Sequence, residues 1–176
     1  MMLSSIIGFL LSDVPLWTLI LAIVLAFIHT RFKQPRLPKI SQINIYLNYL
    51  FFLAVGLVGI WGFIMHCGFP NQAASFIGWH NSPFQWEVGI ANLAMGLCGI
   101  WAARASVDFQ KATTLFLTVF LWGAAVGHIK QMIAMHNFNP GNAGAIFWVD
   151  IITPIILVIL VATKNTLVNK NIQNGD

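Results

Sequence analysis

Charged residues are scarce in this chain. Only 8% of its 176 residues are Asp, Glu, Lys or Arg, and only five are acidic. Soluble globular domains carry about 25% charged residues, so this composition argues against a soluble protein. No hydrophilic stretch is long enough for a second domain, and residues 1–176 are therefore expected to form a single transmembrane domain.

Cysteines and metal-binding motifs are also sparse. The two cysteines, Cys67 and Cys98, fall near a helix end and deep in a helix, which predicts no disulfide framework. The spacings HExxH, ExxH and CxxC do not occur, so any signal for a metal is weak and no cofactor is identified. The basic residues form no stripe with interleaved aromatics, and nucleic acid is therefore not an expected partner.

What the chain has instead is apolar runs. Hydrophobic residues make up 58% of it, in five runs of about the length that spans 30 Å of hydrocarbon. This pattern predicts an all-α integral membrane helical bundle in the lipid bilayer, with a four-helix core and an N-terminal helix outside it. The five predicted spans are residues 14–30, 43–65, 82–103, 111–135 and 145–163, and the polar tail that follows is expected to fray.

The positive charges predict an orientation. If the N-terminus lies outside, eight of the nine Lys and Arg residues fall on the inner side, and only Lys130 does not. Cytoplasmic loops are enriched in Lys and Arg. The chain is therefore expected in the cytoplasmic membrane of a microbe, with its N-terminus outside and its C-terminus in the cytoplasm.

The entrance of the third predicted span carries an acid. Ser82 and Gln85 have the spacing of a capping box, which predicts a helix start. Glu87 follows about one and a half turns in, and Asn92 lies more than a turn deeper. Polar groups at such depth usually face a bundle interior or a watery cavity, so both residues are candidates for a site.

Small residues follow the same helix. They recur at steps of three and four, which makes one narrow face that lets another helix approach closely. This face comprises Gly89, Asn92, Gly96 and Gly99. A second small-residue patch, on the fourth span, comprises Gly123, Ala124 and Gly127.

Three titratable groups share one depth. Counted at 1.5 Å per residue, Glu87, His128 and Asp150 each lie about 7–11 Å below the outer boundary, on three different helices. Gln131 shares a helix face with His128, and His66 ends the second span just above them. Together with Asn92, these residues form the predicted cluster for binding a ligand or a proton.

The sequence is compatible with several roles for this cluster. Carboxylates and an imidazole can relay protons or hold the polar head of a small ligand. Glu87, His128 and Asp150 could also bind a transition metal, each with a lone pair. The same residues could simply hydrogen-bond across helices and fix packing. Lys130 favours this structural reading, because it could neutralise Glu87 or Asp150.

Several short motifs resemble a known protein family. They include Ser82-Pro83-Phe84-Gln85, Glu87-Val88-Gly89, Ala91-Asn92-Leu93, Gly127-His128 and Pro140-Gly141-Asn142-Ala143-Gly144, followed by Asp150. The chain resembles, over about residues 54–162, an uncharacterised family of small multi-pass membrane proteins with a domain of unknown function. The resemblance implies a four-helix membrane bundle and brings no known activity.

Three functional hypotheses follow from these patterns. The leading one is a non-enzymatic module that binds or translocates a small polar ligand, a proton or a cation through Glu87, His128 and Asp150. The second is a membrane oxidoreductase or quinone-binding subunit, since the imidazole and carboxylates lie near Trp and Phe residues. The third is a membrane scaffold whose glycine faces associate with a partner or with a second copy as a homo-oligomer.

Overall fold

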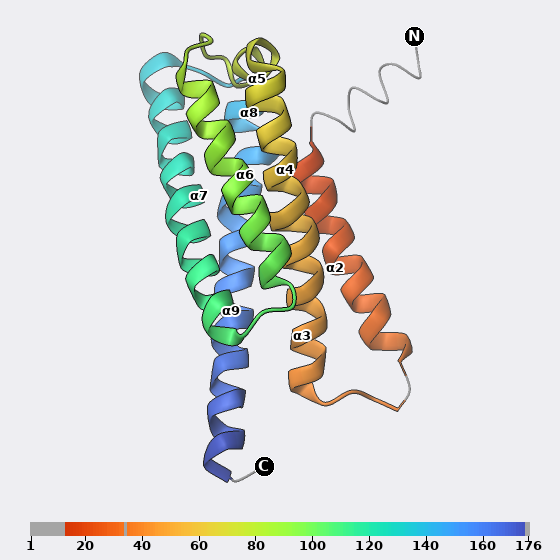
Figure 1. Cartoon of the computed structure of the whole chain (residues 1–176). Coiled ribbons are helices and arrows are strands. Elements are labelled where there is room, and N and C mark those ends of the chain that lie inside the picture. The colour runs from red at the N-terminus through yellow and green to blue at the C-terminus, as the bar shows by residue number, and fades with distance from the viewer. Residues whose placement is uncertain (1–12, 34, 175–176) are drawn as a thin grey trace.

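The computed structural model describes residues 13–33 and 35–174, which form helices joined by short loops, with no strand among them (Figure 1). Three long helices are α2 (Val14–Phe32), α6 (Phe84–Ala102) and α7 (Val107–Met135). The fourth is α9 (Ala145–Asn174). The all-α prediction is confirmed for the described part of the chain.

A further long rod runs without interruption from Lys39 to Gly68. It consists of α3 (Lys39–Tyr49), the π-helical segment η1 (Leu50–Leu57), α4 (Val58–Phe63) and the π-helical segment η2 (Ile64–Gly68). Two short helices, α5 (Pro70–Ile77) and α8 (Pro140–Ala143), lie together at one end of the molecule, here called the α8 end (Figure 1). The connections at 35–38 and 103–106 lie at the opposite end, here called the basic end.

Among the described residues, four segments are long and apolar enough to cross a membrane, so the protein has multi-pass membrane character. These segments are Val14–Phe32, Lys39–Gly68, Val107–Met135 and Pro140–Asn174. The prediction of five spans is not confirmed. The residues of α6 do form a helix beside the others, but Gln85, Glu87 and Asn92 lower its mean hydropathy.

The C-terminal helix is longer than predicted. The polar tail was expected to fray after residue 163, but α9 continues to Asn174, so that prediction is wrong. One contact that holds the extension is a hydrogen bond from Lys164 Nζ to Gln110 Oε1 of α7, at 2.9 Å. Gln110 is buried and also donates from Nε2 to the carbonyl of Ala102, which ties α7 to the end of α6.

Glycines bring α4 and α6 to backbone contact. A Cβ built on Gly59 would lie 2.5 Å from both the Cα and the N of Gly96. A Cβ on Gly99 would lie 2.7 Å from Cγ1 of Val55. Close backbone approach of this kind is the usual role of small residues in membrane helices. The predicted small-residue face of α6 is therefore confirmed, and it is occupied within the chain.

The second small-residue patch behaves differently. A Cβ built on Gly123 or on Gly127 would meet no atom within 4 Å. This face of α7 is therefore unpacked in the part of the chain that the structure describes, although α7 packs closely against α9 along another face.

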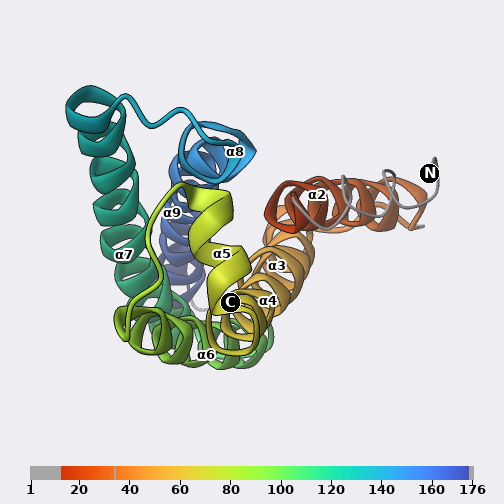
Figure 2. The same ribbon diagram turned by 90° about the horizontal axis from the view of Figure 1, so that it is seen from above.

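The remaining core is made of large apolar side chains from every long helix. Leu47, Leu50 and Phe51 are fully buried and lie in one cluster with Leu117 of α7 and Leu157 of α9. Helix α2 adds Leu19 and Ala22 to this cluster from the edge of the bundle, where it packs on α3, η1 and α9 (Figure 2). One side of α2 remains exposed, which leaves an apolar surface for lipid.

Candidate functional site

Two of the predicted site residues meet at the α8 end. His128 near the end of α7 and Asp150 near the start of α9 face each other, with 3.8 Å between Nε2 and Oδ2. Their side chains are only 9% and 13% exposed. This distance exceeds that of a direct hydrogen bond, so a proton passing between the two groups needs a small movement or a bridging water.

Asn142 of α8 determines which ring nitrogen of His128 carries a proton. Its amide Nδ2 donates to the carbonyl oxygens of His128, at 3.2 Å, and Asn137, at 2.8 Å. The other atom of the amide, Oδ1, lies 2.7 Å from Nδ1 of His128. An amide oxygen only accepts, so Nδ1 must be the donor in this hydrogen bond. The remaining ring nitrogen, Nε2, is thereby the atom that faces Asp150.

Aromatic rings pack on the imidazole of this pair. Trp79 stacks on the imidazole of His128, with 6.3 Å between ring centroids and 24° between planes. Phe147 meets the same ring edge-on at 6.5 Å. The chain reaches Trp79 through Gly78, whose φ of 81° is a left-handed conformation that suits glycine. The two rings and the loop around Asn142 thus limit access of water to the imidazole.

The two connections at the α8 end are joined to each other. Asn137 is buried and donates from Nδ2 to the carbonyl of Ile77, at 2.9 Å. A Cβ on Gly78 would collide with Nδ2 of Asn139, so the loops touch closely. The cover over His128 is therefore one unit built from segments about 60 residues apart in sequence, as the separation of Ile77 and Asn137 shows.

A second polar contact lies on η2 and α6. Nδ1 of His66 and Oε1 of Gln85 are 2.5 Å apart. The predicted capping box is wrong, because α6 starts at Phe84 without a side-chain cap and Gln85 bonds to His66 instead. A surface cleft of about 400 Å³ opens beside this contact and is also lined by Cys67, Asn81 and Trp86.

Glu87 lies away from both contacts. Its side chain is exposed and forms no hydrogen bond or ion pair with another described residue. The reason is helical geometry: Gln85 faces the bundle interior, and a residue two positions later points about 200° away. We expected Glu87 to meet His128 and Asp150, but in the structure only His128 and Asp150 face each other.

The other predicted residues have local roles. Asn92 donates from Nδ2 to the carbonyl of Val88 and packs against Gly62, where its Oδ1 would lie 2.7 Å from a built Cβ. Gln131 is half-buried, and its backbone carbonyl accepts the N–H of Asn137. The metal hypothesis requires at least three ligands close together. In the described ranges, no three His, Cys, Asp or Glu side chains are grouped to hold a metal ion.

Sequence reasoning missed the residues that organise the pair. Asn142 was named only within one of the motifs that carry the family resemblance, and Trp79 was not selected as a candidate. Depth counting could not find them, because they belong to connections rather than to spans.

Comparison with known proteins identifies a family for this chain but no individual relative. A family model described as a family of unknown function (DUF6790) matches residues 12–170. The match is wider than the resemblance over 54–162, and it includes the first helix. Neither a curated protein nor a solved structure matches the chain.

Proposed function

We propose that this chain, which belongs to the family of unknown function DUF6790, is a non-enzymatic membrane module that binds a proton at its His128–Asp150 pair. One observation carries the proposal: an imidazole and a carboxylate, both almost buried, face each other at 3.8 Å where two apolar helices meet. Ionisable side chains inside membrane helices are costly and usually serve a function.

The geometry around the pair supports this use. Because Asn142 engages Nδ1 of His128, the exchangeable proton resides on Nε2 or on Asp150. A proton on Nε2 produces an ion pair, whereas a proton on Asp150 alone leaves both groups neutral. A second proton leaves a net positive charge. Proton uptake therefore changes the charge beneath the loops at the α8 end, where Trp79 contacts the imidazole.

Proton binding is better supported than proton transfer across the helix bundle. The next titratable side chain along the α7–α9 contact is Lys164, which bonds to Gln110 near the basic end. Between these two polar sites lie the buried Leu117 and Leu157 of the apolar core and the buried hydroxyls of Thr114 and Thr153, which do not titrate. A proton would need to cross this stretch without a titratable group, so the proposal covers proton binding, and translocation would require a change of structure.

The proton-binding proposal predicts a titrating carboxylic acid shielded from water. We expect infrared difference spectra, recorded across a pH titration of the purified protein, to show a carboxylic C=O band that Asp150→Asn removes. His128→Gln is expected to move the midpoint of this titration, because the imidazole no longer shares the proton.

Glu87→Gln is the matched control, since it removes an exposed carboxylate at the same end of the protein. Its titrating band should remain unchanged, and thermal unfolding would show that all variants are folded. A band that persists in Asp150→Asn, or disappears in Glu87→Gln, would contradict the proposal.

The cleft beside His66 supports a second candidate function, the binding of a small polar ligand at the same end. Its volume of about 400 Å³ is within the range of small-molecule sites, and its lining offers the Gln85 amide and the His66 imidazole. In this candidate function, His66 would have the ligand-binding role that the sequence predicted for it. Screening polar metabolites by thermal shift, with Gln85→Leu as the variant that should lose the response, would test it.

The other two hypotheses remain predictions. Absorbance spectra of the purified protein would test an oxidoreductase or quinone-binding role. The scaffold hypothesis now depends on α7, because the α6 glycine face is occupied by α4, whereas Gly123 and Gly127 are unpacked. Measuring the mass of the protein–detergent complex for Gly123→Leu would test a homo-oligomer through that face.

The orientation of the chain is also a proposal, with the α8 end outside and the basic end in the cytoplasm. A thiol reagent that cannot cross the membrane is expected to label Cys67 from outside, because Cys67 lines the cleft at the α8 end. Cys98 lies about one turn before the end of α6 that is nearer the basic end, and a reagent that cannot cross the membrane should leave it unlabelled from outside. Cys67→Ser serves as the control, and labelling of Cys67 only from the cytoplasmic side would reverse the orientation.

A further inference from the structure

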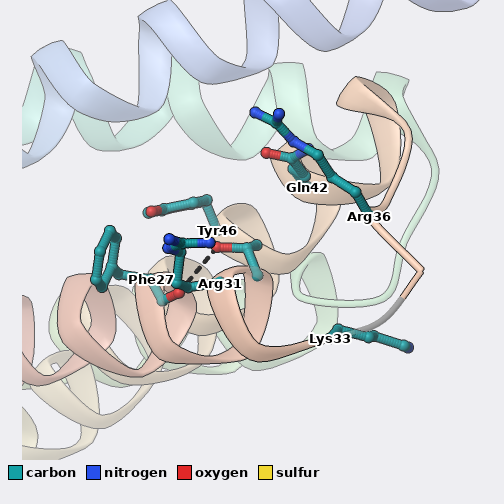
Figure 3. Close-up of a pocket in the computed structure, with 7 residues that line it drawn as sticks. Phe27, Arg31, Lys33, Arg36, Gln42 and Tyr46 are labelled. Carbon is teal, nitrogen blue, oxygen red and sulfur yellow. Dashed lines mark hydrogen bonds between the residues drawn. The ribbon is translucent and has the colours of Figure 1, made fainter.

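A basic pocket of about 420 Å³ lies between the end of α2 and the start of α3. Arg31, Lys33 and Arg36 supply its positive charge, and Gln42 and Tyr46 of α3 line it from the other side (Figure 3). In Figure 3 the Lys33 side chain extends away from the other labelled residues, whereas Arg36 extends over Gln42. Both arginines line the pocket together with Gln42 and Tyr46, so they are the cations considered for a ligand there.

These cations have no acidic partner in the part of the chain that the structure describes. Within residues 13–33 and 35–174, none of the three forms an ion pair, and Asp108 at the same end is engaged by Lys111. The hydroxyl of Tyr46 likewise forms no hydrogen bond with a described residue. The pocket thus offers two guanidinium groups and a free O–H donor, a set that suits an anionic oxygen ligand.

The pocket keeps its shape through local hydrogen bonds. Gln42 donates from Nε2 to the carbonyl of Leu37 at 2.7 Å, which holds the α2–α3 connection against α3. Thr30 donates to the carbonyls of Ala26 and Phe27, so its hydroxyl hydrogen is used within α2. The loop that carries Arg36 is therefore attached to the helix that carries Tyr46.

An apolar surface leads from the pocket along α2. Phe27 lines the pocket and is 54% exposed. The same helix exposes a series of large apolar side chains that continues away from the basic end: Ile28, Val24, Ile23, Leu21 and Ile20. A free phosphate would use only the pocket, whereas a molecule with an acyl chain would use both the pocket and this surface.

We propose that the basic pocket binds the phosphate of an anionic phospholipid, with Arg31 and Arg36 on the headgroup and an acyl chain along the exposed face of α2. Arginine pairs with phosphate oxygens through two parallel N–H groups, and basic pockets at helix ends are known sites for lipid headgroups. Tyr46 donates a further hydrogen bond. This site is separate from the proposed proton site, which lies at the opposite end of the bundle (Figure 1).

The test is the binding of phosphatidylglycerol to the purified full-length protein in detergent, measured by native mass spectrometry. We expect the double variant Arg31→Gln/Arg36→Gln to weaken this binding about 30-fold, because each cation contributes about fivefold to the attraction. The matched control is Arg104→Gln/Lys170→Gln, which removes two exposed cations at the same end but outside the pocket. This control should change the affinity less than about threefold.

Two further probes identify the source of the phosphate. Phosphatidylcholine should bind much more weakly, because its headgroup carries no net charge, and inorganic phosphate should not compete. Equal weakening by both double variants would show a general charge effect and overturn the proposal. Equal binding of phosphatidylcholine, or displacement by inorganic phosphate, would overturn it as well, since the site would then recognise the apolar surface or the free anion.

Discussion

Replacing Gly59 by alanine is expected to destabilise the protein by about 2 kcal/mol, the usual cost of overpacking a close contact. The new Cβ would lie 2.5 Å from the backbone of Gly96, and a backbone cannot rotate away as a long side chain can. Alanine is the better helix former, so a loss of stability would reflect the contact between α4 and α6 rather than local helix propensity. Unfolding in mixed micelles with increasing denaturing detergent would measure it.

The matched control is Gly123→Ala on α7. Its Cβ would meet no atom within 4 Å, so only the helix propensity changes. Stability should remain the same or rise by up to about 1 kcal/mol. The two substitutions are chemically identical, and opposite signs of their effects would confirm the packing of α4 on α6. Equal effects would mean that these two helices do not touch at Gly59.

Replacing Asn142 by alanine is expected to cost about 3 kcal/mol, at about 1 kcal/mol for each of three hydrogen bonds. Asn142 is fully buried and bonds to the His128 ring, to the His128 carbonyl and to the Asn137 carbonyl. Its loss leaves Nδ1 of His128 and two carbonyls without these partners. The same unfolding experiment would measure this cost.

A second readout separates stability from function. Without Asn142 the imidazole of His128 can rotate or exchange its proton between both nitrogens, so the infrared titration of Asp150 should also move. The control Asn81→Ala removes one exposed hydrogen bond, to Asn71, and should cost less than about 1 kcal/mol. An Asn142→Ala protein as stable as this control would show that α8 does not cover His128.

The sequence allowed much of the candidate site to be predicted. His128 and Asp150 were found by counting residues from the helix ends, and the structure brings them together. His66 was also placed at the correct end, although its partner Gln85 was assigned to a helix cap. Glu87 was selected by the same depth argument and does not join them, because depth describes the position along a helix and not the direction around it.

The sequence by itself determined that this chain is made of long apolar helices, because a chain in hydrocarbon must satisfy its backbone hydrogen bonds within each segment. Only the tertiary structure decided which polar groups meet. The rotation of each helix about its axis turns Gln85 inward and Glu87 outward, and the packing of α8 places Asn142 against His128. These choices depend on contacts between segments far apart in sequence, such as the backbone contact of Gly59 with Gly96, and no local pattern contains them.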